Sequence, residues 1–346
     1  MIDYITLDVN SGIPKYLQII DSIIHNISRG NFKIGDKIPS ISKLSEEFYI
    51  SRDTVERAYR VLKKRNIIVS VHGKGTYVAA AQLISKPRIL FLVNKLSTYK
   101  MRVYNSFFKK MGDSAQVDLQ SYHCDETLFL ELMMKYKSSY DYFVIIPHFR
   151  TVNLLHKSFT EKVNNVLNSI PKENLIILDN EDHKIEGNFI EVYQDFENNI
   201  YEALVKANKQ IDKYKTISLV YPKTSFYPYP KRILKGFLKY CADFNYDFKI
   251  VEEISNEMHI KKGSLFITLE DEHLVNLINN IKSANYKLGK EVGIISYNDT
   301  ALKQLLGISV LSLDFENMGE QAAKMIIENK KGKVKTPFNY IERESL

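Results

Sequence analysis

The 346-residue sequence has very few cysteines and no long apolar run. Its two cysteines, Cys124 and Cys241, lie far apart and lack the CxxC spacing of a zinc site, so we predict two reduced packing residues and no disulfide framework. No stretch approaches the roughly 18 consecutive apolar residues of a membrane span. The opening MIDYITLDVN has neither the basic nor the apolar region of a signal peptide. We therefore expect a cytoplasmic protein without a membrane partner.

Signatures of cofactor and metal chemistry are also missing. No GxGxxG or GxxxxGK[ST] follows any expected strand, which argues against a nucleotide cofactor. The carboxylates of residues 179–182 and the run His123-Cys124-Asp125 are too short to indicate a metal site. A Schiff-base lysine beside an aspartate partner, as pyridoxal phosphate enzymes need, is not recognisable. We predict no catalytic residue, no metal and no cofactor, and hence no enzyme.

Positive charge is concentrated near the N-terminus. The composition, 45% apolar and 26% charged, is that of an ordinary globular chain of two or three domains. Of the net charge of +7, the first 80 residues contribute 12 Lys and Arg against 8 Asp and Glu, and the other 266 contribute 36 against 33. The basic excess per residue is thus several-fold higher in the first 80, which suits a polyanionic partner bound there.

Residues 34–78 predict a helix, a turn, a second helix and a hairpin. The first helix begins after Pro39, and Ser51 is the expected N-cap of the second. The turn of the hairpin is residues 72–75, with two glycines. This order is typical of a winged helix-turn-helix, which we assign to residues 1–79. One buried stripe of the second helix is expected to hold Val55, Ala58, Tyr59 and Leu62.

Polar residues in this segment are candidates for DNA contacts. The first turn of a recognition helix meets base edges in the major groove, so Arg52 and Thr54 are expected to read sequence. Arg57 lies further along the helix and suits a phosphate. The alternative, that these charges only form i,i+4 pairs on a solvated helix, is less favoured because all the motifs occur in the right order. The wing is expected to contribute His72, Gly73 and Lys74.

Residues 12–79 resemble the winged-helix domain of the GntR family of bacterial transcription regulators. The resemblance is carried by GIPKYLQIIDSIIHNISRGNFKIGDKIPS, SRDTVERAYRVLKKRNII and HGKGTYV. It implies that Arg52, Thr54 and the pair His72-Gly73 contact double-stranded operator DNA, and Ser42 stands where the family often has an arginine. A helix over residues 11–30 is expected to pack behind, burying Ile13, Leu17, Ile20, Ile24 and Ile27.

After a short linker at 80–87, residues 88–346 alternate between strands and helices. The run RILFLV at 88–93 is typical of a strand buried on both faces of a parallel sheet. We predict an α/β fold, a two-lobed, doubly wound α/β body. Strands are expected at 88–93, 117–123, 142–147, 174–179, 189–192, 216–221, 248–253, 264–269, 292–297 and 309–313, and helices at 103–111, 126–137, 150–168, 196–211, 230–244, 271–285, from 299, and at 315–329.

Polar residues after these strands are candidate ligand contacts, because such sheets bind ligands at the carboxyl ends of their strands. Each residue taken singly has a competing explanation as an ordinary loop or cap residue. The rule also selects Lys95 after the first strand. Aromatic residues of loop 225–232 suit stacking on a sugar, and its arginine suits hydroxyls or a carboxylate. The predicted ligand contacts are Asn94, His148, Asp179, Tyr227, Tyr229, Arg232, Asp271 and Asn298.

Residues 88–341 resemble the effector domains of the LacI/GalR family, which have the periplasmic sugar-binding fold. The resemblance is strongest in GKEVGIISYNDTALKQLLGISVLSLDFENMGEQAAKMII. It implies that Asn298 replaces a ligand-contacting acid and that Asp179 and Asp271 face the ligand. RILKGF at 232–237 resembles the family's Arg-x-x-Gly stretch, with Arg232 one residue further from Gly236 than usual.

The combination of the two domains resembles hybrid repressors that respond to arabinose and bind DNA as dimers. It implies a homodimeric repressor of a carbohydrate-utilisation operon, released from double-stranded operator DNA by a small sugar. A ligand-dependent activator, and a regulator that responds to a sugar phosphate or sugar acid, are the alternatives.

Overall fold

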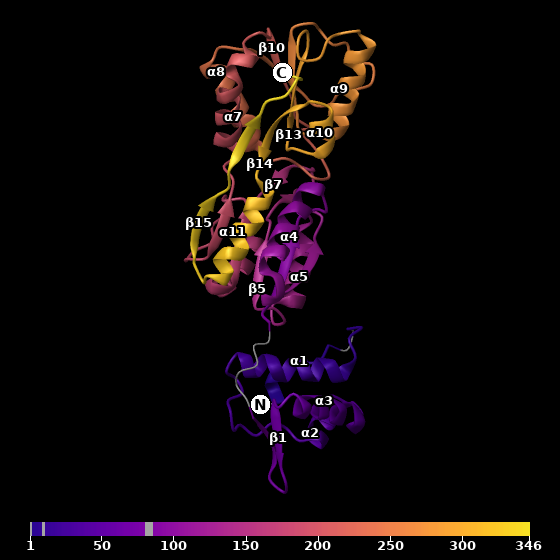
Figure 1. The fold of residues 1–346 in the computed structure, drawn as a ribbon, viewed down its shortest axis with the longest axis vertical. Helices are drawn as coiled ribbons and strands as arrows, with labels where there is room; N and C mark the ends of the chain where they lie inside the picture. Colours follow the sequence, from indigo (N-terminus) through magenta and orange to yellow (C-terminus); the bar gives the residue numbers. More distant parts are fainter. Residues whose placement is uncertain (1, 9–10, 80–85) are drawn as a thin grey trace. The chain divides into compact units, whose positions relative to one another are not determined.

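A computed structural model describes residues 2–8, 11–79 and 86–346 (Figure 1). Contacts divide the chain into two compact units, Met1–Lys86 and Pro87–Leu346. The predicted linker, 80–87, falls mainly on residues 80–85, which lie outside the described residues. Each unit buries a hydrophobic core of its own.

The N-terminal unit is a small helical domain with a two-stranded wing. Two helices begin at serine N-caps: Ser40 Oγ accepts a hydrogen bond from the Lys43 amide and Ser51 Oγ from the Thr54 amide, each at 3.2 Å. The predicted stripe of the second helix is fully buried, as expected. The elements are η1 (Ile2–Tyr4), α1 (Lys15–Ser28), α2 (Ile41–Glu47), α3 (Arg52–Lys64) and the antiparallel strands β1 (Ile68–Val71) and β2 (Gly75–Val78).

Helix α1 is shorter than predicted and fully buries only Ile20 and Ile27 of the predicted stripe. It begins only after Pro14, which leaves Ile13 outside the helix and 48% exposed. Leu17 and Ile24 are only partly buried. The face that packs on α3 follows the helical period through Ile19, Ile20, Ile23 and Ile27. The prediction included Ile13 in the helix and therefore placed Leu17 and Ile24 on the buried face.

The first lobe of the C-terminal unit is a six-stranded parallel sheet in the order β15-β9-β8-β5-β3-β4. One face is covered by α4 and α11 and the other by α5 and α6. Gly319 allows α11 to pack closely on α4, since a Cβ there would lie 2.2 Å from the Val103 carbonyl oxygen. The strands are β3 (Arg88–Val93), β4 (Gln116–Ser121), β5 (Tyr142–Ile145), β8 (Leu175–Asp179), β9 (Ile190–Tyr193) and β15 (Gly332–Lys335); the helices are α4 (Thr98–Met111), α5 (Glu126–Tyr136), α6 (Glu161–Asn168) and α11 (Phe315–Ile327), with short turns η2 (Gly112–Ser114) and η3 (Lys172–Asn174).

The second lobe is a six-stranded sheet in the order β11-β10-β12-β13-β14-β16, parallel except for β16. Helices α7 and α8 cover one face and α9 covers the other. The predicted fold class is thus confirmed. The strands are β10 (Thr216–Val220), β11 (Asp247–Val251), β12 (Ser264–Thr268), β13 (Gly293–Tyr297), β14 (Ser309–Leu313) and β16 (Phe338–Ile341); the helices are α7 (Phe196–Ile211), α8 (Lys231–Asp243), α9 (Asp271–Ser283) and α10 (Ala301–Leu305).

The lobes are not two successive halves of the chain. Helix α7 packs on α8 in the second lobe, whereas α11 and β15 return to the first. The chain therefore crosses between the lobes near residues 194, 314 and 336. The sequence analysis did not predict β15 or β16, because both strands are short and neither contains a continuous apolar run.

The predicted helix 150–168 is wrong over its first half. The backbone instead forms a small hairpin of β6 (Phe149–Arg150) and β7 (His156–Lys157), and α6 begins only at Glu161, after its N-cap Thr160. The helix predicted at 103–111 begins earlier, at Thr98, because Ser97 caps it. Both differences matter because each brings side chains to the space between the lobes.

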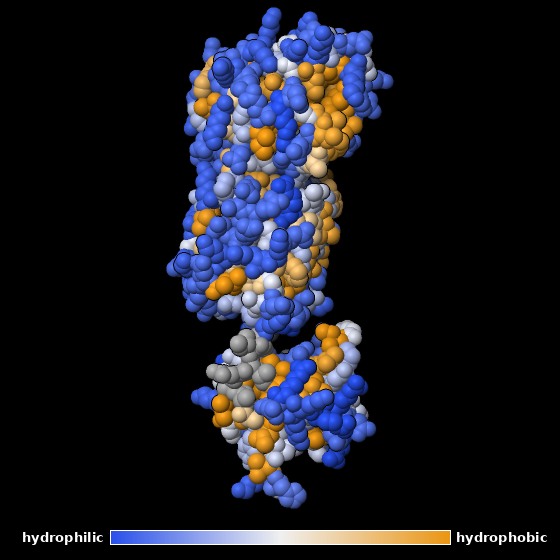
Figure 2. All heavy atoms as spheres, viewed as in Figure 1, coloured by the Kyte–Doolittle hydropathy of each residue, from blue (hydrophilic) through white to orange (hydrophobic). Residues whose placement is uncertain are grey.

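The surface is mainly polar, with a few apolar areas (Figure 2). One of them lies over α9 and α10, where Leu302, Leu305 and Leu306 are exposed. Among the described residues, no helix is both long and apolar enough to span a bilayer. Both cysteines are buried and unbonded to each other.

Candidate DNA-binding surface and effector pocket

Helix α3 presents an exposed N-terminus. Arg52 is exposed and makes no hydrogen bond or ion pair within the described part of the chain. Thr54 is partly buried, and its hydroxyl lies 2.8 Å from that of Ser51. Arg57 is exposed but stacks on Tyr16 of α1, with 4.0 Å between the guanidinium carbon and the ring centroid. Arg52 is thus the candidate whose side chain is free to reach a base edge.

The wing carries its three candidates at the tip. His72, Gly73 and Lys74 are all exposed in the turn between β1 and β2. Gly73 has a φ of +70°, which favours glycine, and the Lys74 amide donates to the Val71 carbonyl at 3.0 Å. A hydroxyl pair, Ser70 and Thr76, joins the strands at 3.0 Å. Hydrogen bonds within the hairpin therefore stabilise the turn, while its side chains are exposed to solvent.

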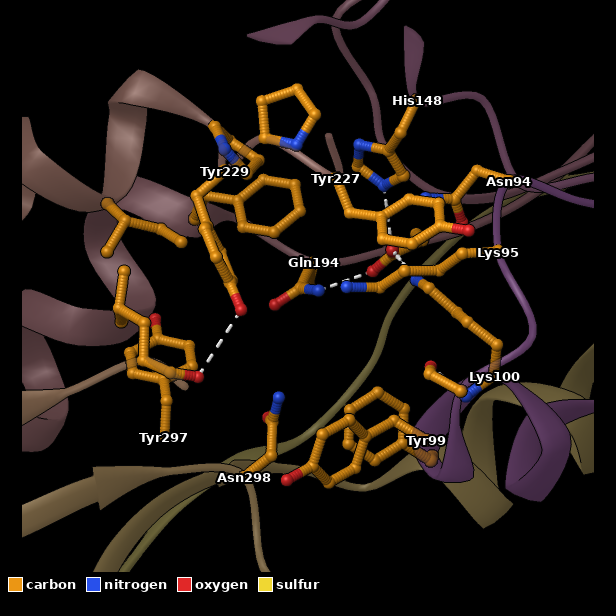
Figure 3. A pocket seen from close by; sticks show the side chains of 18 residues that line it. Asn94, Lys95, Tyr99, Lys100, His148, Gln194, Tyr227, Tyr229, Tyr297 and Asn298 are labelled. Carbon is orange, nitrogen blue, oxygen red and sulfur yellow. Dashed lines mark hydrogen bonds and ion pairs between the residues drawn. The ribbon is translucent and has the colours of Figure 1, made fainter. Parts of the chain in front are cut away.

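A pocket lies between the two lobes of the C-terminal unit, at the carboxyl ends of β3, β8 and β13. It encloses about 710 Å³ of empty space, part of it open to solvent. Figure 3 shows Asn94, Lys95, Tyr99 and Gln194 around it from the first lobe and Tyr227, Tyr229, Tyr297 and Asn298 from the second. The lining residues are Asn94, Lys95, Ser97, Tyr99, Lys100, His148, Asp179, Gln194, Phe196, Tyr227, Pro228, Tyr229, Pro230, Ile233, Leu269, Tyr297, Asn298 and Phe315.

Six of the eight predicted ligand contacts line this pocket: Asn94, His148, Asp179, Tyr227, Tyr229 and Asn298. The other two, Arg232 and Asp271, do not. Arg232 points to Asp195 (2.9 Å) and Glu181 (3.4 Å), and the exposed Asp271 pairs with the buried Lys303 at 2.8 Å. Both lie in the first turn of a helix and form ion pairs with neighbouring side chains. The geometry therefore gives no support to a ligand contact by either.

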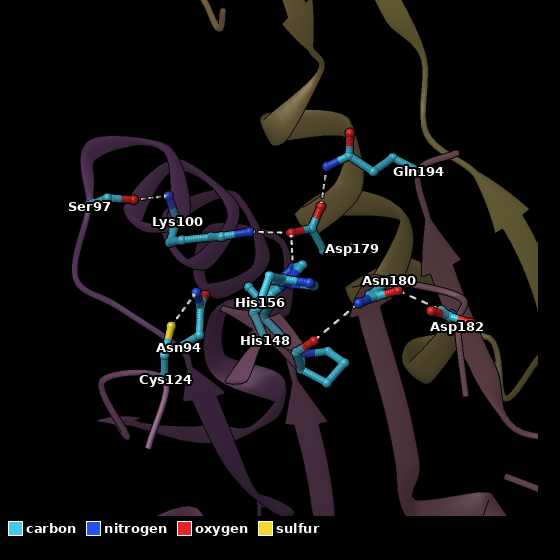
Figure 4. A network of polar contacts seen from close by, with 12 residues as sticks. Asn94, Ser97, Lys100, Cys124, His148, His156, Asp179, Asn180, Asp182 and Gln194 are labelled. Atoms are coloured by element: carbon cyan, nitrogen blue, oxygen red, sulfur yellow. Dashed lines mark hydrogen bonds and ion pairs between the residues drawn. The ribbon is translucent and has the colours of Figure 1, made fainter. Parts of the chain in front are cut away.

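Asp179 is the centre of a buried polar network (Figure 4). One carboxylate oxygen accepts from Lys100 Nζ and lies 2.8 Å from His148 Nε2, and the other accepts from Gln194. His148 Nδ1 in turn lies 2.8 Å from His156 Nε2 in the small hairpin. Asp179 has a φ of +73° and Asn298 one of +63°. Non-glycine residues in this region are uncommon, and here both mark the edge of the pocket.

The network keeps its aspartate ionised. Burial by itself raises the pKa of Asp179, but the Lys100 ammonium and the hydrogen bond from His148 outweigh it and hold that pKa well below its ordinary value. Burial lowers the pKa of His148 more than the Asp179 carboxylate raises it. Burial also lowers the pKa of His156, and His148 lowers it further. Both histidines are therefore neutral near pH 7.

We expect stability to fall as the pH drops through the histidine range. An unfolded histidine binds a proton near pH 6.5, whereas folded His148 and His156 resist it, so the unfolded state gains protons first. The free energy of unfolding should be level above about pH 7 and fall below 6.5, by at most about 1.4 kcal/mol per pH unit for each histidine. Melting temperatures between pH 7.5 and 5.5 measure this.

A matched pair of variants assigns the effect. His156→Gln should flatten the profile, because it removes one of the two buried titrating rings. His259→Gln removes an exposed histidine and should leave the slope as in the wild type. Equal slopes in both variants would show that the buried pair does not set the pH dependence.

Several contacts join the lobes around the pocket. Tyr99 of α4 lies 3.3 Å from Lys303 Nζ, and Arg102 donates to the Asp299 carbonyl at 3.0 Å. On the opposite side, His123 Nδ1 lies 3.2 Å from the Tyr227 hydroxyl. The loop that carries Tyr227 is also bound to the small hairpin, through the Ser225 amide and the Leu154 carbonyl. The lobes are thus held together over the pocket.

Sequence reasoning missed much of the lining. Tyr99 and Lys100 lie in the part of α4 that was not predicted as helix, and Gln194 lies on the crossing between lobes. Phe196 and Phe315 each begin the helix that follows a crossing. The serine N-cap at Ser97 was the available signal for the first two, because it places the start of α4 at Thr98.

The N-terminal domain matches a known family. The profile "Bacterial regulatory proteins, gntR family" matches residues 15–78. The mannosyl-D-glycerate transport/metabolism system repressor MngR of Escherichia coli is 48% identical over 65 residues, which is 19% of this chain and 27% of MngR. The arabinose metabolism transcriptional repressor of Geobacillus stearothermophilus is 36% identical over 67 residues, 19% of this chain and 18% of that protein. The chain thus spans only about a quarter or less of these relatives.

The C-terminal unit matches a second family. The profile "Periplasmic binding protein-like domain" matches residues 212–346. The trehalose repressor from Escherichia coli has a similar structure, with a TM-score of 0.57 and 14% identity over 74% of this chain and all of that one. At this identity the likeness shows the fold alone. The chain therefore joins an N-terminal region that matches the gntR family profile to a C-terminal unit that matches the periplasmic-binding-protein-like profile.

Proposed function

We propose that this protein is a cytoplasmic repressor of a carbohydrate-utilisation operon. The N-terminal domain binds double-stranded operator DNA, and a small sugar or sugar-derived effector, bound between the lobes, releases it. The observation that carries the proposal is the pocket itself, because its lining comes from both lobes. Any ligand that fills it contacts both and so favours one arrangement of the lobes over another.

The N-terminal domain supports the DNA half of the proposal. Arg52, His72 and Lys74 are exposed at the two places where a winged helix meets DNA, the start of its recognition helix and the tip of its wing. Thr54 and Arg57 lie along the same helix, and Gly73 lets the wing backbone approach a phosphate. MngR and the arabinose metabolism transcriptional repressor are similar to this chain over 65 and 67 residues, about the length of the gntR-family match, which supports a repressor role.

The pocket lining supports a sugar-like effector. Tyr99 and Phe315 stack with their centroids 5.3 Å apart and offer an apolar wall, as Tyr229 does from the other lobe. Asn94 Oδ1, Asn298 Oδ1 and the Tyr297 hydroxyl are buried and have no hydrogen-bond partner among the described residues. Aromatic faces combined with free amide and hydroxyl groups suit a ligand whose ring carries several hydroxyls.

A homodimer is the third part of the proposal. Two winged helices in one assembly bind two half-sites, and a change in the effector domains alters how well both can engage. Leu302 and Leu305 of α10, with Leu306 directly after it, form an exposed apolar surface, which is typical of subunit interfaces. Burial of this surface in a second copy would remove it from water.

Fluorescence anisotropy tests the proposal. The full chain is titrated against the duplex upstream of its own gene and against a shuffled duplex, with and without a panel of sugars, sugar acids and sugar phosphates. We expect tight binding to the upstream duplex alone and its loss in the presence of one compound. Tighter DNA binding with that compound would point to a ligand-dependent activator or corepressor, and binding insensitive to every compound would contradict the effector role.

A further inference from the structure

One cation in the pocket has no anionic partner. Lys95 follows β3, and its ammonium reaches toward Gln194 across the pocket (Figure 3). In the described ranges, Lys95 makes no hydrogen bond or ion pair. It meets only two aromatic faces, at 5.2 Å from the Tyr227 centroid and 5.6 Å from that of Tyr229. These distances approach the limit of a cation–π contact, and ring faces leave the three ammonium donors without a strong acceptor.

The other charges around the pocket are already paired. Lys100 and His148 both bind Asp179, whose second oxygen is bound by Gln194. Outside the lining, Lys303 pairs with Asp271 and Arg343 with Asp299. The remaining carboxylate near Lys95 is Glu270, which faces His273 at 3.6 Å. With His148 neutral, the lining carries one net positive charge, and it is that of Lys95.

An unpaired ammonium in such a place is costly. Burial lowers the pKa of Lys95, and the neighbouring Lys100 ammonium lowers it further; together they outweigh the Glu270 and Asp179 carboxylates, which raise it, so the charged form is disfavoured. A ligand oxyanion would reverse this penalty through charge-assisted hydrogen bonds. Lys95 thus forms no structural ion pair, and its ammonium is placed to bind an oxyanion of a ligand.

We propose that the effector is an anionic sugar derivative, whose phosphate or carboxylate binds Lys95 while its hydroxyls bind Asn94, Asn298 and Tyr297. The inference rests on the proposed function, in that it assumes the pocket between the lobes to be the effector site. Phosphate and carboxylate share the oxyanion that Lys95 recognises, and the experiment separates them.

The first measurement needs no ligand. Lys95→Met removes an unpaired, partly buried charge and keeps a flexible chain of similar length, so we expect the melting temperature of the free protein to rise. Lys109→Met, at an exposed position on α4, serves as the matched control and should leave it unchanged. A fall in melting temperature for Lys95→Met would make Lys95 a structural cation and overturn the inference.

The second measurement is calorimetric titration of the full chain at pH 7.5 and constant ionic strength. The ligands are matched sets of a neutral aldose, its terminal phosphate and its aldonic acid, for glucose, arabinose and ribose, with inorganic phosphate as a control. We expect a charged member to bind best and to lose roughly 10- to 150-fold in affinity in Lys95→Met, but not in Lys109→Met. Which charged member binds distinguishes phosphate from carboxylate.

Two results would contradict the inference in different ways. A neutral sugar that binds as tightly as its charged forms, with equal affinity in Lys95→Met, would overturn the anionic effector and leave the sugar-responsive repressor standing. Failure of every compound to bind, or binding of inorganic phosphate alone, would reject the pocket as a sugar site and the proposed function with it.

Discussion

Asp179→Ala should destabilise the C-terminal unit by about 3 to 5 kcal/mol, because it leaves Lys100 buried without its carboxylate. Asp179 is 2% exposed and serves three donors from three separate parts of the first lobe. Removing it also leaves His148 and Gln194 without the carboxylate that orients them. Denaturant unfolding of the full chain measures the loss as a lower midpoint of the transition of this unit.

Two companion variants sharpen this prediction. Asp182→Ala, at an exposed position three residues on, should change stability by no more than about 0.5 kcal/mol. Asp179→Asn keeps the shape but not the charge and should be intermediate. Because the pKa of Asp179 is depressed in the folded state, its carboxylate adds stability above the unfolded pKa near 3.9, and this contribution is lost as the pH falls below that value. Asp179→Ala lacks this contribution, so its free energy of unfolding should fall less on acidification than that of the wild type. An unchanged midpoint would refute the role given to the network.

The winged helix could be predicted from local signals. Ser51, the apolar stripe of α3 and the glycine turn of the wing each act within a few residues of chain, and each holds in the structure. Strand ends were equally informative in the body, since the carboxyl end of a parallel strand lies at the binding edge wherever the strand sits. That rule selected Asn94, Asp179 and Asn298, which meet in one pocket.

The rest of the pocket depends on contacts that no local pattern contains. Gln194 belongs to it because the chain crosses between lobes there, and the sequence marks no crossing. Arg232 has the composition of a ligand contact, but Asp195 and Glu181 come to it from the crossing and the loop after β8. The Ser97 cap places Lys100 on α4, but its burial depends on a partner 79 residues away along the chain. The roles of these residues depend on contacts with residues that are far away in the sequence.

The basic side chains of α3 and of the pocket also differ in whether the fold already uses their charge. On α3, Arg60 lies 3.7 Å from Glu56 one turn earlier and Arg57 stacks on Tyr16, so part of the charge is used within the domain. Arg52 makes no hydrogen bond or ion pair among the described residues, and in the pocket Lys95 likewise makes none, although it lies over two tyrosine rings. In both places the side chain that the fold does not use is the one available to a partner.

Arg52→Ala should therefore weaken operator binding with little effect on the fold. If Arg52 reads a base edge, its loss costs about 1 to 3 kcal/mol, roughly 5- to 150-fold in affinity, and the loss falls mainly on the specific duplex. Lys64→Ala, further along α3, should weaken the specific and shuffled duplexes alike and reduce the dependence of affinity on salt. Anisotropy titrations with both duplexes at two salt concentrations compare the variants.

The matched control is Lys109→Ala, which removes an exposed lysine of the C-terminal unit. This variant should bind both duplexes with wild-type affinity. Thermal unfolding should be unchanged in Arg52→Ala, since the side chain makes no hydrogen bond within the described residues. Equal losses on both duplexes would make Arg52 a phosphate contact. Wild-type affinity for the operator would remove it from the interface and leave Thr54 and the wing as the candidates for sequence readout.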